Sequence, residues 1–360
     1  MTIVIEDIPY NLEDFLFKNL ILTENNAPNC LASEFLTTWI SGCKEFKIQT
    51  SGSTGEPKSI ILKRKWMEAS ALQTINILGL WNENVLCCLP CNKIGGLMMI
   101  VRSLAGGFNL TIHEPKADPL SRIELDHTFT FISLVPAQLV SIFESKDSIE
   151  KLNKFKTVLL GGAPLSNETL DQLNLIIPDV YLTYGMTETC SHIALQKLNN
   201  GSWSRFKVND YVDIKTDDMG LLSINGFQTG NEWVHTKDIV KIHDSKSFEF
   251  IGRADFMINS GGYKIFPEVL EQKIKTLFKL KGWEANLAIT DIAHEKWGSS
   301  VVLVMDKHKT PSEHQIIDYL IVKLLKHELP KQVLILDVIP YFDNGKLNRL
   351  RLRELVSAIS

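Results

Sequence analysis

Short apolar segments alternate with helix-like segments through the first half of the chain, and this alternation most constrains the fold. The apolar segments at 85–89, 110–113, 129–134 and 157–160 have the length of strands, and a helix-like pattern follows each of them. Strands that alternate with helices are typical of α/β folds. We therefore predict a large N-terminal domain with mixed α/β sheets.

The two ends of the chain have different patterns. Before the alternation, amphipathic stretches around Leu12–Leu20 and Phe35–Trp39 predict two helices. After residue 200, short strands with tight turns, such as 221–226 and 249–252, predict a small β-rich region. From about residue 256 the pattern predicts a helix at 267–278, strands at 284–290 and 299–305, a helix at 311–327, a strand at 333–337 and a last helix from about Leu347.

The last segment is long enough to be an independent domain. The predicted organisation is a large N-terminal domain over 1–251, a hinge at 252–255 and a small mobile α+β C-terminal domain over 256–360.

Composition restricts the partners. The 360-residue chain has a formal net charge of −4 with interspersed charges, which argues against nucleic acid or an anionic membrane as the main partner. Apolar runs fall short of the roughly 18 residues that a membrane span needs, and the first residues lack a signal-peptide pattern. We expect a cytoplasmic protein, either a monomer or a homodimer.

The loop at 50–58 combines small hydroxyl residues, glycines and a lysine. So little side-chain bulk lets backbone N–H groups approach an anion such as a polyphosphate. The loop is not a Walker A motif because Pro57 precedes the lysine. Apolar segments at 46–48 and 60–62 predict a hairpin around it, and the alternative is a flexible linker. The candidate ligands are Thr50, Ser51, Gly52, Ser53, Thr54, Gly55 and Lys58.

Two further segments follow strand-like runs. Gly161, Gly162 and Ala163 come directly after the strand at 157–160, where a base could approach the backbone or where the chain could simply turn. The segment 183–192 follows the strand-like Val180–Leu182. In it, Tyr184 and Gly185 could face a base, Thr187 a phosphate and Glu188 an Mg²⁺ ion, although Thr187 and Glu188 could also cap a helix.

Cysteines suggest a different chemistry, a zinc site. Cys88 and Cys91 form a C-x-x-C pair to which Cys190 and His192 could add ligands. We favour the interpretation that these cysteines are small hydrophobes at the end of a buried strand.

Charged residues in the last third of the chain provide more candidates. Asp238 could accept the hydroxyls of a ribose, and Arg253 could serve ribose or phosphate, although turn residues of these types are common. Asp255 occupies the predicted hinge. Lys346 follows an Asn-Gly turn and could meet a carboxylate and a phosphate together, although it could also be a solvated lysine. A second glycine-rich loop, which would let another ligand pass close to the backbone, contributes Ser260, Gly261, Gly262 and Lys264.

Taken in order, these stretches resemble the core motifs of the adenylate-forming superfamily, which includes acyl-CoA synthetases, luciferases and adenylation domains. The motifs are the Ser/Thr/Gly-Lys loop, Tyr184-Gly-Met-Thr-Glu, Gly252-Arg-x-Asp and Asn344-Gly-Lys. The resemblance runs from about residue 46 to the C-terminus. The chain is shorter than the roughly 500 residues usual in the superfamily, mostly before the loop. Around residues 184–191 it is most similar to the o-succinylbenzoate–CoA ligases of menaquinone biosynthesis.

The chain departs from the superfamily at two positions. Lys237 replaces a glycine before Asp238, which is itself kept. Lys93 stands where many relatives have a histidine before a Gly-Gly pair, here Gly95 and Gly96. The resemblance places that position in the acyl pocket, together with Ser191. A cation there would suit an acid with a second carboxylate, such as o-succinylbenzoate.

The resemblance implies a two-step reaction with ATP, Mg²⁺ and coenzyme A. The acid attacks the α-phosphorus of ATP to give acyl-AMP and pyrophosphate, and the thiol of coenzyme A then expels AMP. Lys58 and its loop would hold the β- and γ-phosphates, Thr187 would lie near the α-phosphate and Glu188 would bind Mg²⁺. Lys346 would bridge carboxylate and α-phosphate, and rotation about Asp255 would bring the Ser260–Lys264 loop to coenzyme A.

Two other functions remain open from sequence. The chain could load an aryl or amino acid onto a carrier protein, or it could be a non-catalytic AMP-binding relative. The presence of Lys58, Glu188, Asp238, Arg253 and Lys346 together argues against the non-catalytic alternative.

Overall fold

The computed structural model describes residues 1–17, 28–49, 58–162, 165–283, 285–306, 311–342 and 346–359. The chain forms two compact units. The first consists of Met1–Lys215, Ser223–Val234 and His243–Phe248, and the second of Thr216–Leu222, His235–Ile242 and Glu249–Ser360. The chain thus passes between the units several times, and the domain boundaries drawn from sequence remain a prediction.

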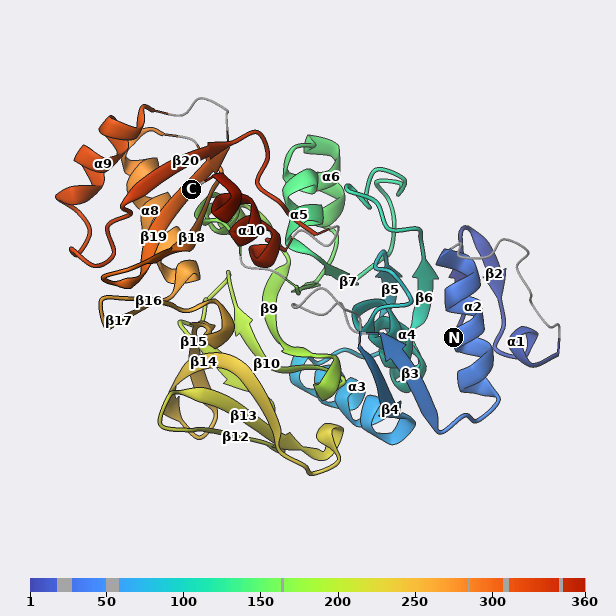
Figure 1. Cartoon of the computed structure of the whole chain (residues 1–360). Helices are drawn as coiled ribbons and strands as arrows, with labels where there is room; N and C mark the ends of the chain where they lie inside the picture. Colours follow the sequence, from blue (N-terminus) through green and yellow to red (C-terminus); the bar gives the residue numbers. More distant parts are fainter. Residues whose placement is uncertain are drawn as a thin grey trace. The chain divides into compact units, whose positions relative to one another are not determined.

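A mixed sheet forms the centre of the first unit (Figure 1). Its strands neighbour one another in the order β11-β10-β9-β8-β7-β5-β6-β1-β2. The run from β9 to β1 is parallel, whereas β10, β11 and β2 pair antiparallel with their neighbours. The strands are β1 (Ile3–Ile5), β2 (Ile8–Tyr10), β5 (Asn84–Cys87), β6 (Asn109–Ile112), β7 (Phe131–Leu134), β8 (Thr157–Leu160), β9 (Asp179–Met186), β10 (Ser191–Lys197) and β11 (Phe206–Val208).

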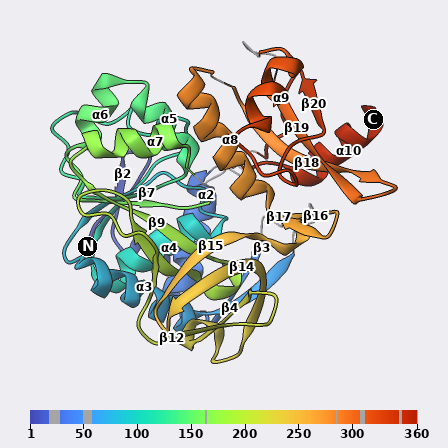
Figure 2. The same cartoon turned by 90° about the vertical axis from the view of Figure 1, so that its left-hand side faces the viewer.

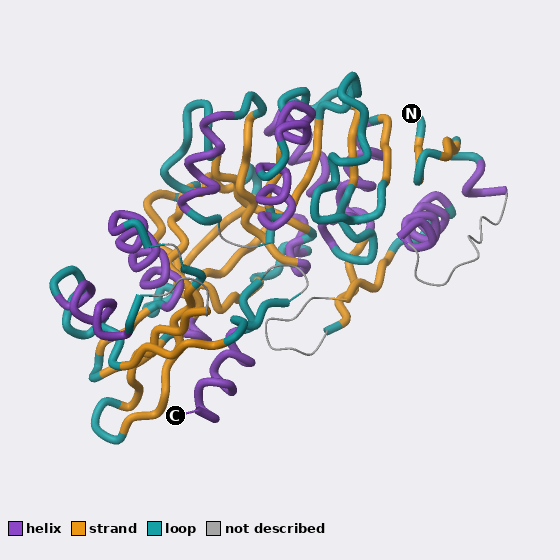
Figure 3. The backbone as a smooth tube through the Cα atoms, turned by 90° about the horizontal axis from the view of Figure 1, so that it is seen from above, coloured by secondary structure: helices purple, strands orange, loops and turns teal. Residues whose placement is uncertain are grey.

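Helices cover both faces of this sheet because its central strands are apolar on both sides (Figure 3). Along β5, Val85 and Cys87 belong to one buried cluster and Leu86 to the other. The first cluster contains residues of α2 (Pro28–Ile40), α3 (Arg64–Leu78) and α4 (Ile94–Gly106), and the second contains residues of α5 (Pro136–Phe143), α6 (Lys146–Leu152) and α7 (Asn167–Gln172). The predicted α/β class is confirmed.

The hairpin predicted around the glycine-rich loop is present. Strands β3 (Glu45–Gln49) and β4 (Ser59–Lys63) pair antiparallel, with Gln49 opposite Ser59. The loop residues 50–57 themselves lie outside the described residues.

The prediction that a helix follows every strand was wrong for the strand at 110–113. After β6 the chain runs through turns to β7, and Leu120 and Ile123 fill the second buried cluster in place of a helix. Pro115 and Pro119 explain the difference, because proline removes a backbone donor and clashes inside a helix.

The N-terminal prediction was incomplete. Strands β1 and β2 were not foreseen, and β1 extends the parallel sheet beside β6. The first predicted helix is described only as the short α1 (Asp14–Phe17), since residues 18–27 are outside the described ranges, whereas α2 matches the second prediction.

Four further strands form the predicted β-rich segment. They are β12 (Val212–Thr216), β13 (Leu221–Gly226), β14 (Val234–Asp244) and β15 (Ser247–Arg253), and β15 pairs with β11 through Phe248 and Phe206.

The second unit is built on a five-stranded sheet in the order β17-β16-β19-β18, with β20 parallel to β19 (Figure 2). Helices α8 and α9 contribute to one buried cluster with Ile289 and Leu303, whereas α10 packs with Ala288 and Val302 on the opposite face. The elements are β16 (Ile258–Ser260), β17 (Tyr263–Ile265), α8 (Pro267–Lys281), β18 (Leu287–His294), β19 (Gly298–Asp306), α9 (Glu313–Ile321), β20 (Gln332–Leu336) and α10 (Arg349–Ile359).

Two helix limits in this unit differ from prediction. Helix α9 ends at Ile321 rather than near His327, and the Glu328 carboxylate accepts from the Leu325 N–H (2.9 Å), a donor that a continued helix would have used. The last helix begins at Arg349 because Asn348 caps it, accepting from the Arg351 N–H (3.0 Å).

The helices of the described ranges include none that is both long and apolar enough to cross a membrane.

Candidate active site

Parallel pairing of β8 and β9 brings the two predicted base-binding segments together at the carboxyl ends of these strands. Leu160 lies opposite Leu182, and the Thr183 hydroxyl donates to the Leu160 carbonyl (2.9 Å). Gly161, directly after β8, therefore lies beside the end of β9, which carries Tyr184. The Tyr184 ring packs edge-on against Phe248, with centroids 5.0 Å apart. Ala163 lies outside the described residues.

A tight turn after β9 carries the predicted phosphate and metal residues. Residues Thr187–Thr189 form a 3-10 helix, and the Thr189 hydroxyl bonds to the carbonyls of Met186 (3.0 Å) and Ser191 (2.7 Å). Thr187 is half-buried and Glu188 is exposed at the surface. The fixed turn presents both side chains at the carboxyl end of β9, where α/β proteins bind ligands.

The turn ends in strained backbone. Ser191 has a φ of 108°, and Cys190 before it has a φ of 52°. Non-glycine residues in such conformations cost of order 1–3 kcal/mol and occur preferentially at functional sites. The strain supports Ser191 as a site residue, in addition to its predicted place in the acyl pocket.

Gly185 is required by packing between β9 and β10. A Cβ atom there would lie 2.1 Å from the Ser191 carbonyl oxygen and 2.5 Å from the His192 Cα. We expect Gly185→Ala to destabilise the protein by about 3 kcal/mol, because backbone atoms on both strands must shift. Urea unfolding measures this change, with Gly95→Ala as the control, because a Cβ on Gly95 meets only the Leu89 side chain, at 3.3 Å. Equal unfolding midpoints for the two variants would contradict the packing argument.

A buried arginine lies directly behind this turn. Arg102, on α4, is 3% exposed, and its Nη2 donates to Ser191 Oγ (3.0 Å) and lies 3.4 Å from His192 Nδ1. Nη1 has only the weak acceptor Met99 Sδ at 3.9 Å, and Nε has no acceptor among the described residues. Burial lowers the pKa of Arg102 to about 10, which the neighbouring Cys87 partly offsets.

No carboxylate of the described residues pairs with Arg102. Burying a guanidinium is costly unless an anion compensates it. The site is therefore suited to an anionic ligand that approaches Ser191.

The imidazole of His192 contacts the same Nη2 of Arg102 that donates to Ser191. Its Nε2 lies 3.1 Å from Thr74 Oγ1, and the Thr74 hydroxyl donates to the Ser70 carbonyl (3.1 Å). Burial, and after it the charge of Arg102, holds the pKa of His192 well below its usual range, so the ring is neutral. Since Arg102 can only donate, Nδ1 is the acceptor and Nε2–H donates to Thr74.

Lys93, Gly95 and Gly96 lie at the start of the helix that carries Arg102. Lys93 is the half-buried N-cap residue of α4. A Cβ on Gly96 would lie 2.4 Å from the Pro90 carbonyl oxygen, so this glycine is explained by packing within the protein. The assignment of these residues to acid binding remains a prediction.

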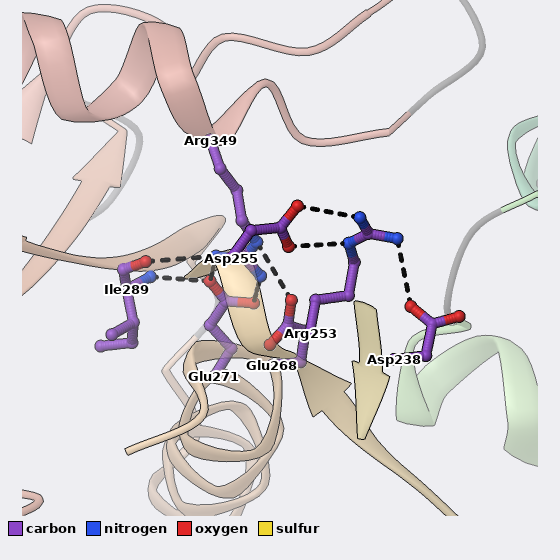
Figure 4. Close-up of polar contacts among 7 residues, drawn as sticks. All are labelled: Asp238, Arg253, Asp255, Glu268, Glu271, Ile289 and Arg349. Atoms are coloured by element: carbon purple, nitrogen blue, oxygen red, sulfur yellow. Dashed lines mark hydrogen bonds and ion pairs between the residues drawn. The ribbon is translucent and has the colours of Figure 1, made fainter. Parts of the chain in front are cut away.

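In the second unit, one arginine joins two aspartates (Figure 4). Arg253 bonds both oxygens of Asp255, with Nε–Oδ1 at 3.0 Å and Nη2–Oδ2 at 2.9 Å, and its Nη1 lies 3.1 Å from Asp238 Oδ1. Burial tends to raise the pKa of Asp255, but the hydrogen bonds and charge of Arg253, aided by Lys237, hold it below its usual range. The predicted ribose and hinge residues are thus one ionic cluster.

Lys346 lies within electrostatic reach of the same cluster. Although part of its side chain is exposed, surrounding protein displaces water from the ammonium group and lowers its pKa. The charge of Arg253 lowers that pKa further, and Asp238 opposes the change. The structure therefore brings Lys346 to Asp238 and Arg253, although it follows them by about 100 positions along the sequence.

Two described residues near Lys346 in the sequence, Tyr341 and Arg349, are held by side-chain contacts. On one side, Tyr341 Oη donates to Asn286 Oδ1 (2.9 Å). On the other, Arg349 bonds both oxygens of Glu271 (3.0 and 2.9 Å) and its Nε lies 3.3 Å from Glu268 Oε1 (Figure 4). These contacts anchor the two residues to α8 and to the chain before β18.

The second glycine-rich loop is the turn of the β16–β17 hairpin. Gly261 and Gly262 both have positive φ (60° and 85°) between the paired Ser260 and Tyr263, as a two-residue hairpin turn requires. Lys264 is exposed next to this turn. The glycines are explained by the turn, and contact with coenzyme A remains a prediction.

The predicted polyphosphate loop is described only at its end. Lys58 is exposed immediately before β4, whereas the residues from Thr50 to Gly55 lie outside the described ranges.

Glu188 fits the way proteins bind magnesium with a nucleotide. Mg²⁺ is usually held by one or two carboxylates, substrate phosphates and water rather than by a protein cage. Glu188 provides one exposed carboxylate near the predicted phosphate residue. Within the described residues there is no group of three or more His, Cys, Asp or Glu side chains that could hold a metal by themselves.

Sequence reasoning missed Arg102, His192 as a partner of Arg102, and Thr74. In the sequence of α4, Arg102 directly follows five apolar residues, Leu97–Val101. A single charged residue next to an apolar run in a buried helix is the signal that could have identified Arg102.

The sequence resembles those of known enzymes. A family model described as AMP-binding enzyme matches residues 46–237. A 2-succinylbenzoate–CoA ligase of Bacillus cereus is 29% identical over 339 residues, which cover 86% of this chain and 69% of that protein.

Solved structures extend the comparison. An acyl-CoA synthetase (AMP-forming)/AMP-acid ligase II-like protein from Dyadobacter fermentans is 33% identical, with a TM-score of 0.62 over 93% of this chain and 96% of that chain. An o-succinylbenzoate–CoA synthetase from Bacillus subtilis, solved with its acyl-adenylate intermediate, is 23% identical with a TM-score of 0.71 over 85% of this chain and 68% of that chain.

Proposed function

The chain belongs to the AMP-binding enzyme family and is an AMP-forming acid–CoA ligase, and from this premise we propose that its acid is o-succinylbenzoate. The proposed reaction has two steps. One carboxylate attacks the α-phosphorus of ATP, forming acyl-AMP and releasing pyrophosphate. The thiol sulfur of coenzyme A then attacks the acyl carbon, its proton is lost, and AMP leaves as o-succinylbenzoyl-CoA forms.

Arg102 is the observation that carries this choice of acid. Its buried guanidinium has an Nε–H donor with no acceptor among the described residues, and it bonds the strained Ser191 after the turn at Thr187–Thr189. A dicarboxylic acid would leave one carboxylate free after the other has reacted. That second carboxylate would compensate the buried charge through charge-assisted hydrogen bonds. The relatives of the chain include ligases that are named for this acid.

The other site residues are assigned to the groups of ATP and of the acid that they would contact. We assign Thr187 to the α-phosphate, Glu188 to Mg²⁺, Lys58 to the outer phosphates, and Asp238 with Arg253 to the ribose. Lys346 would neutralise the acid and the α-phosphate as they meet. Mg²⁺ supplies charge neutralisation on the phosphates when bound. In this proposal, residues 252–255 are the hinge about which the C-terminal domain rotates between the two half-reactions. We further propose that the protein acts in the cytoplasm.

ATP–pyrophosphate exchange across a panel of acids tests the proposal. The panel contains o-succinylbenzoate, its two monocarboxylate analogues, benzoate, fatty acids and amino acids. We expect o-succinylbenzoate to have the highest kcat/KM, with AMP as the product and coenzyme A as the acceptor. Preference for a monocarboxylic acid would contradict the choice of acid, and transfer only to a carrier protein would favour the alternative function.

Lys93 is the second cation near the proposed acid, and we expect Lys93→Ala to weaken its binding. The KM for o-succinylbenzoate should rise roughly tenfold, as for the loss of one partly exposed charge-assisted contact, while the KM for ATP stays unchanged. Steady-state kinetics with each substrate varied measures the two constants. An unchanged KM for the acid would remove Lys93 from the pocket.

A further inference from the structure

We propose that His192 is a positioning residue that holds the Arg102 guanidinium in the orientation needed to bind the acid, with Thr74 fixing the His192 tautomer. This inference rests on the proposed function, because it assumes that Arg102 contacts the acid. It adds a residue that does not itself touch the acid and that the comparisons do not assign.

The first step of the argument is the direction of the hydrogen bonds. Arg102 donates from Nη2 to Ser191 Oγ and to His192 Nδ1, and His192 Nε2–H donates to Thr74 Oγ1, whose own hydroxyl donates to the Ser70 carbonyl. Each N–H or O–H hydrogen in this chain of bonds has one acceptor, so the chain has a single consistent direction.

The second step is the rigidity of what holds the chain. Ser70 and Thr74 lie one turn apart on α3, and the Ser70 hydroxyl also donates to the Cys190 carbonyl (3.0 Å). Helix α3 is thereby tied to Cys190, the strained residue directly before β10. The neighbouring helix α4 brings Arg102, so the guanidinium is held between two helices and one strand.

The third step is what the arrangement does to Arg102. Ser191 and His192 occupy the two hydrogens of Nη2, which leaves Nε–H without an acceptor among the described residues. A guanidinium with one nitrogen fixed cannot rotate its other donors away. A carboxylate that reaches it therefore meets donors already in place, and less binding energy is spent on ordering them.

Replacing His192 tests this role. In His192→Leu the ring is lost but an apolar volume remains, and we expect the KM for the acid to rise about tenfold, with kcat and the KM for ATP changed less than twofold. In His192→Gln the amide can accept from Arg102 and donate to Thr74, so the KM should return to within about threefold of the parent value. Thr74→Val, which removes the acceptor for Nε2–H, should raise the KM about threefold.

A double-variant cycle separates positioning from a general structural effect. In an Arg102→Met background, His192→Leu should change the KM for the acid by less than twofold, because nothing remains to be positioned. His127→Gln is the matched control, since that histidine bonds the Lys151 carbonyl (3.0 Å) elsewhere in the same unit. Thermal unfolding of every variant shows which are folded.

The outcomes distinguish the two proposals. If the wild-type enzyme does not activate a dicarboxylic acid, or Arg102→Met alone leaves the KM for the acid unchanged, the proposed function fails. Crystal structures of His192→Leu and His192→Gln still test the positioning, which predicts a displaced guanidinium in the first and a retained one in the second. An additive cycle, no rescue by glutamine, or an unmoved guanidinium in His192→Leu would overturn the inference.

Discussion

Lys346→Ala is expected to lower the rate of acyl-adenylate formation at least about 100-fold while thioester formation from supplied acyl-AMP falls less than about threefold. The magnitude is typical for removing one charged group that stabilises a transition state. The separation of the two steps follows from the chemistry. Adenylation joins two anions, whereas the thiol attacks an acyl carbon that is already activated. The structure places Lys346 beside Asp238 and Arg253, in the cluster proposed to bind the nucleotide.

Two assays measure this split. Pyrophosphate exchange reports the first half-reaction, and release of AMP from synthetic o-succinylbenzoyl-AMP with coenzyme A reports the second. Arg351→Ala is the control, because Arg351 is an exposed cation near Lys346 in sequence whose partner is Glu354 (3.0 Å), and exposed ion pairs contribute little. Equal losses in both half-reactions would refute a role for Lys346 in adenylation alone.

Arg102→Met is expected to lower kcat/KM for o-succinylbenzoate about 100-fold, equivalent to about 3 kcal/mol. The acid's second carboxylate would then be buried without its partner. The better monocarboxylate analogue has no such group, so its kcat/KM should change less than about threefold. The variant would therefore lose most of its discrimination between the two acids.

Competition between the two acids measures this discrimination directly. Arg122→Met provides the control, since Arg122 pairs with Glu6 (3.0 Å) and Asp7 rather than with the turn after β9. Parallel losses for the dicarboxylic and monocarboxylic acids would mean that Arg102 supports the fold of the site rather than the recognition of a second carboxylate.

The sequence predicted the central strands well because their residues are apolar on both faces. Thr157–Leu160 is buried at every position and was predicted with its exact limits. The three-residue strands β1 and β2 are too short for a periodic pattern to be distinguished from a turn. Helix ends were less predictable where a side chain from elsewhere, such as Glu328, takes a backbone donor.

Some residues of the candidate site could also be predicted from the sequence, and others could not. Motifs within a few residues, such as Tyr184–Glu188, could be found by their composition. The Arg102–His192 pair joins residues 90 positions apart and depends on the packing of α4 against β10. No local pattern contains that packing. For Gly185, the sequence motif was recognised, but the close contact with the Ser191 backbone that requires a glycine there could not be predicted.

The anchors on both sides of Lys346 affect when conformational entropy is lost. The bond from Tyr341 to Asn286 and the bonds from Arg349 to Glu271 hold these two residues in place in the folded chain. Fixing backbone costs roughly 1–2 kcal/mol per residue, and here much of that cost is met during folding rather than during each turnover. For the adenylation role proposed for Lys346, the backbone at Tyr341 and Arg349 is therefore already ordered before the substrates bind.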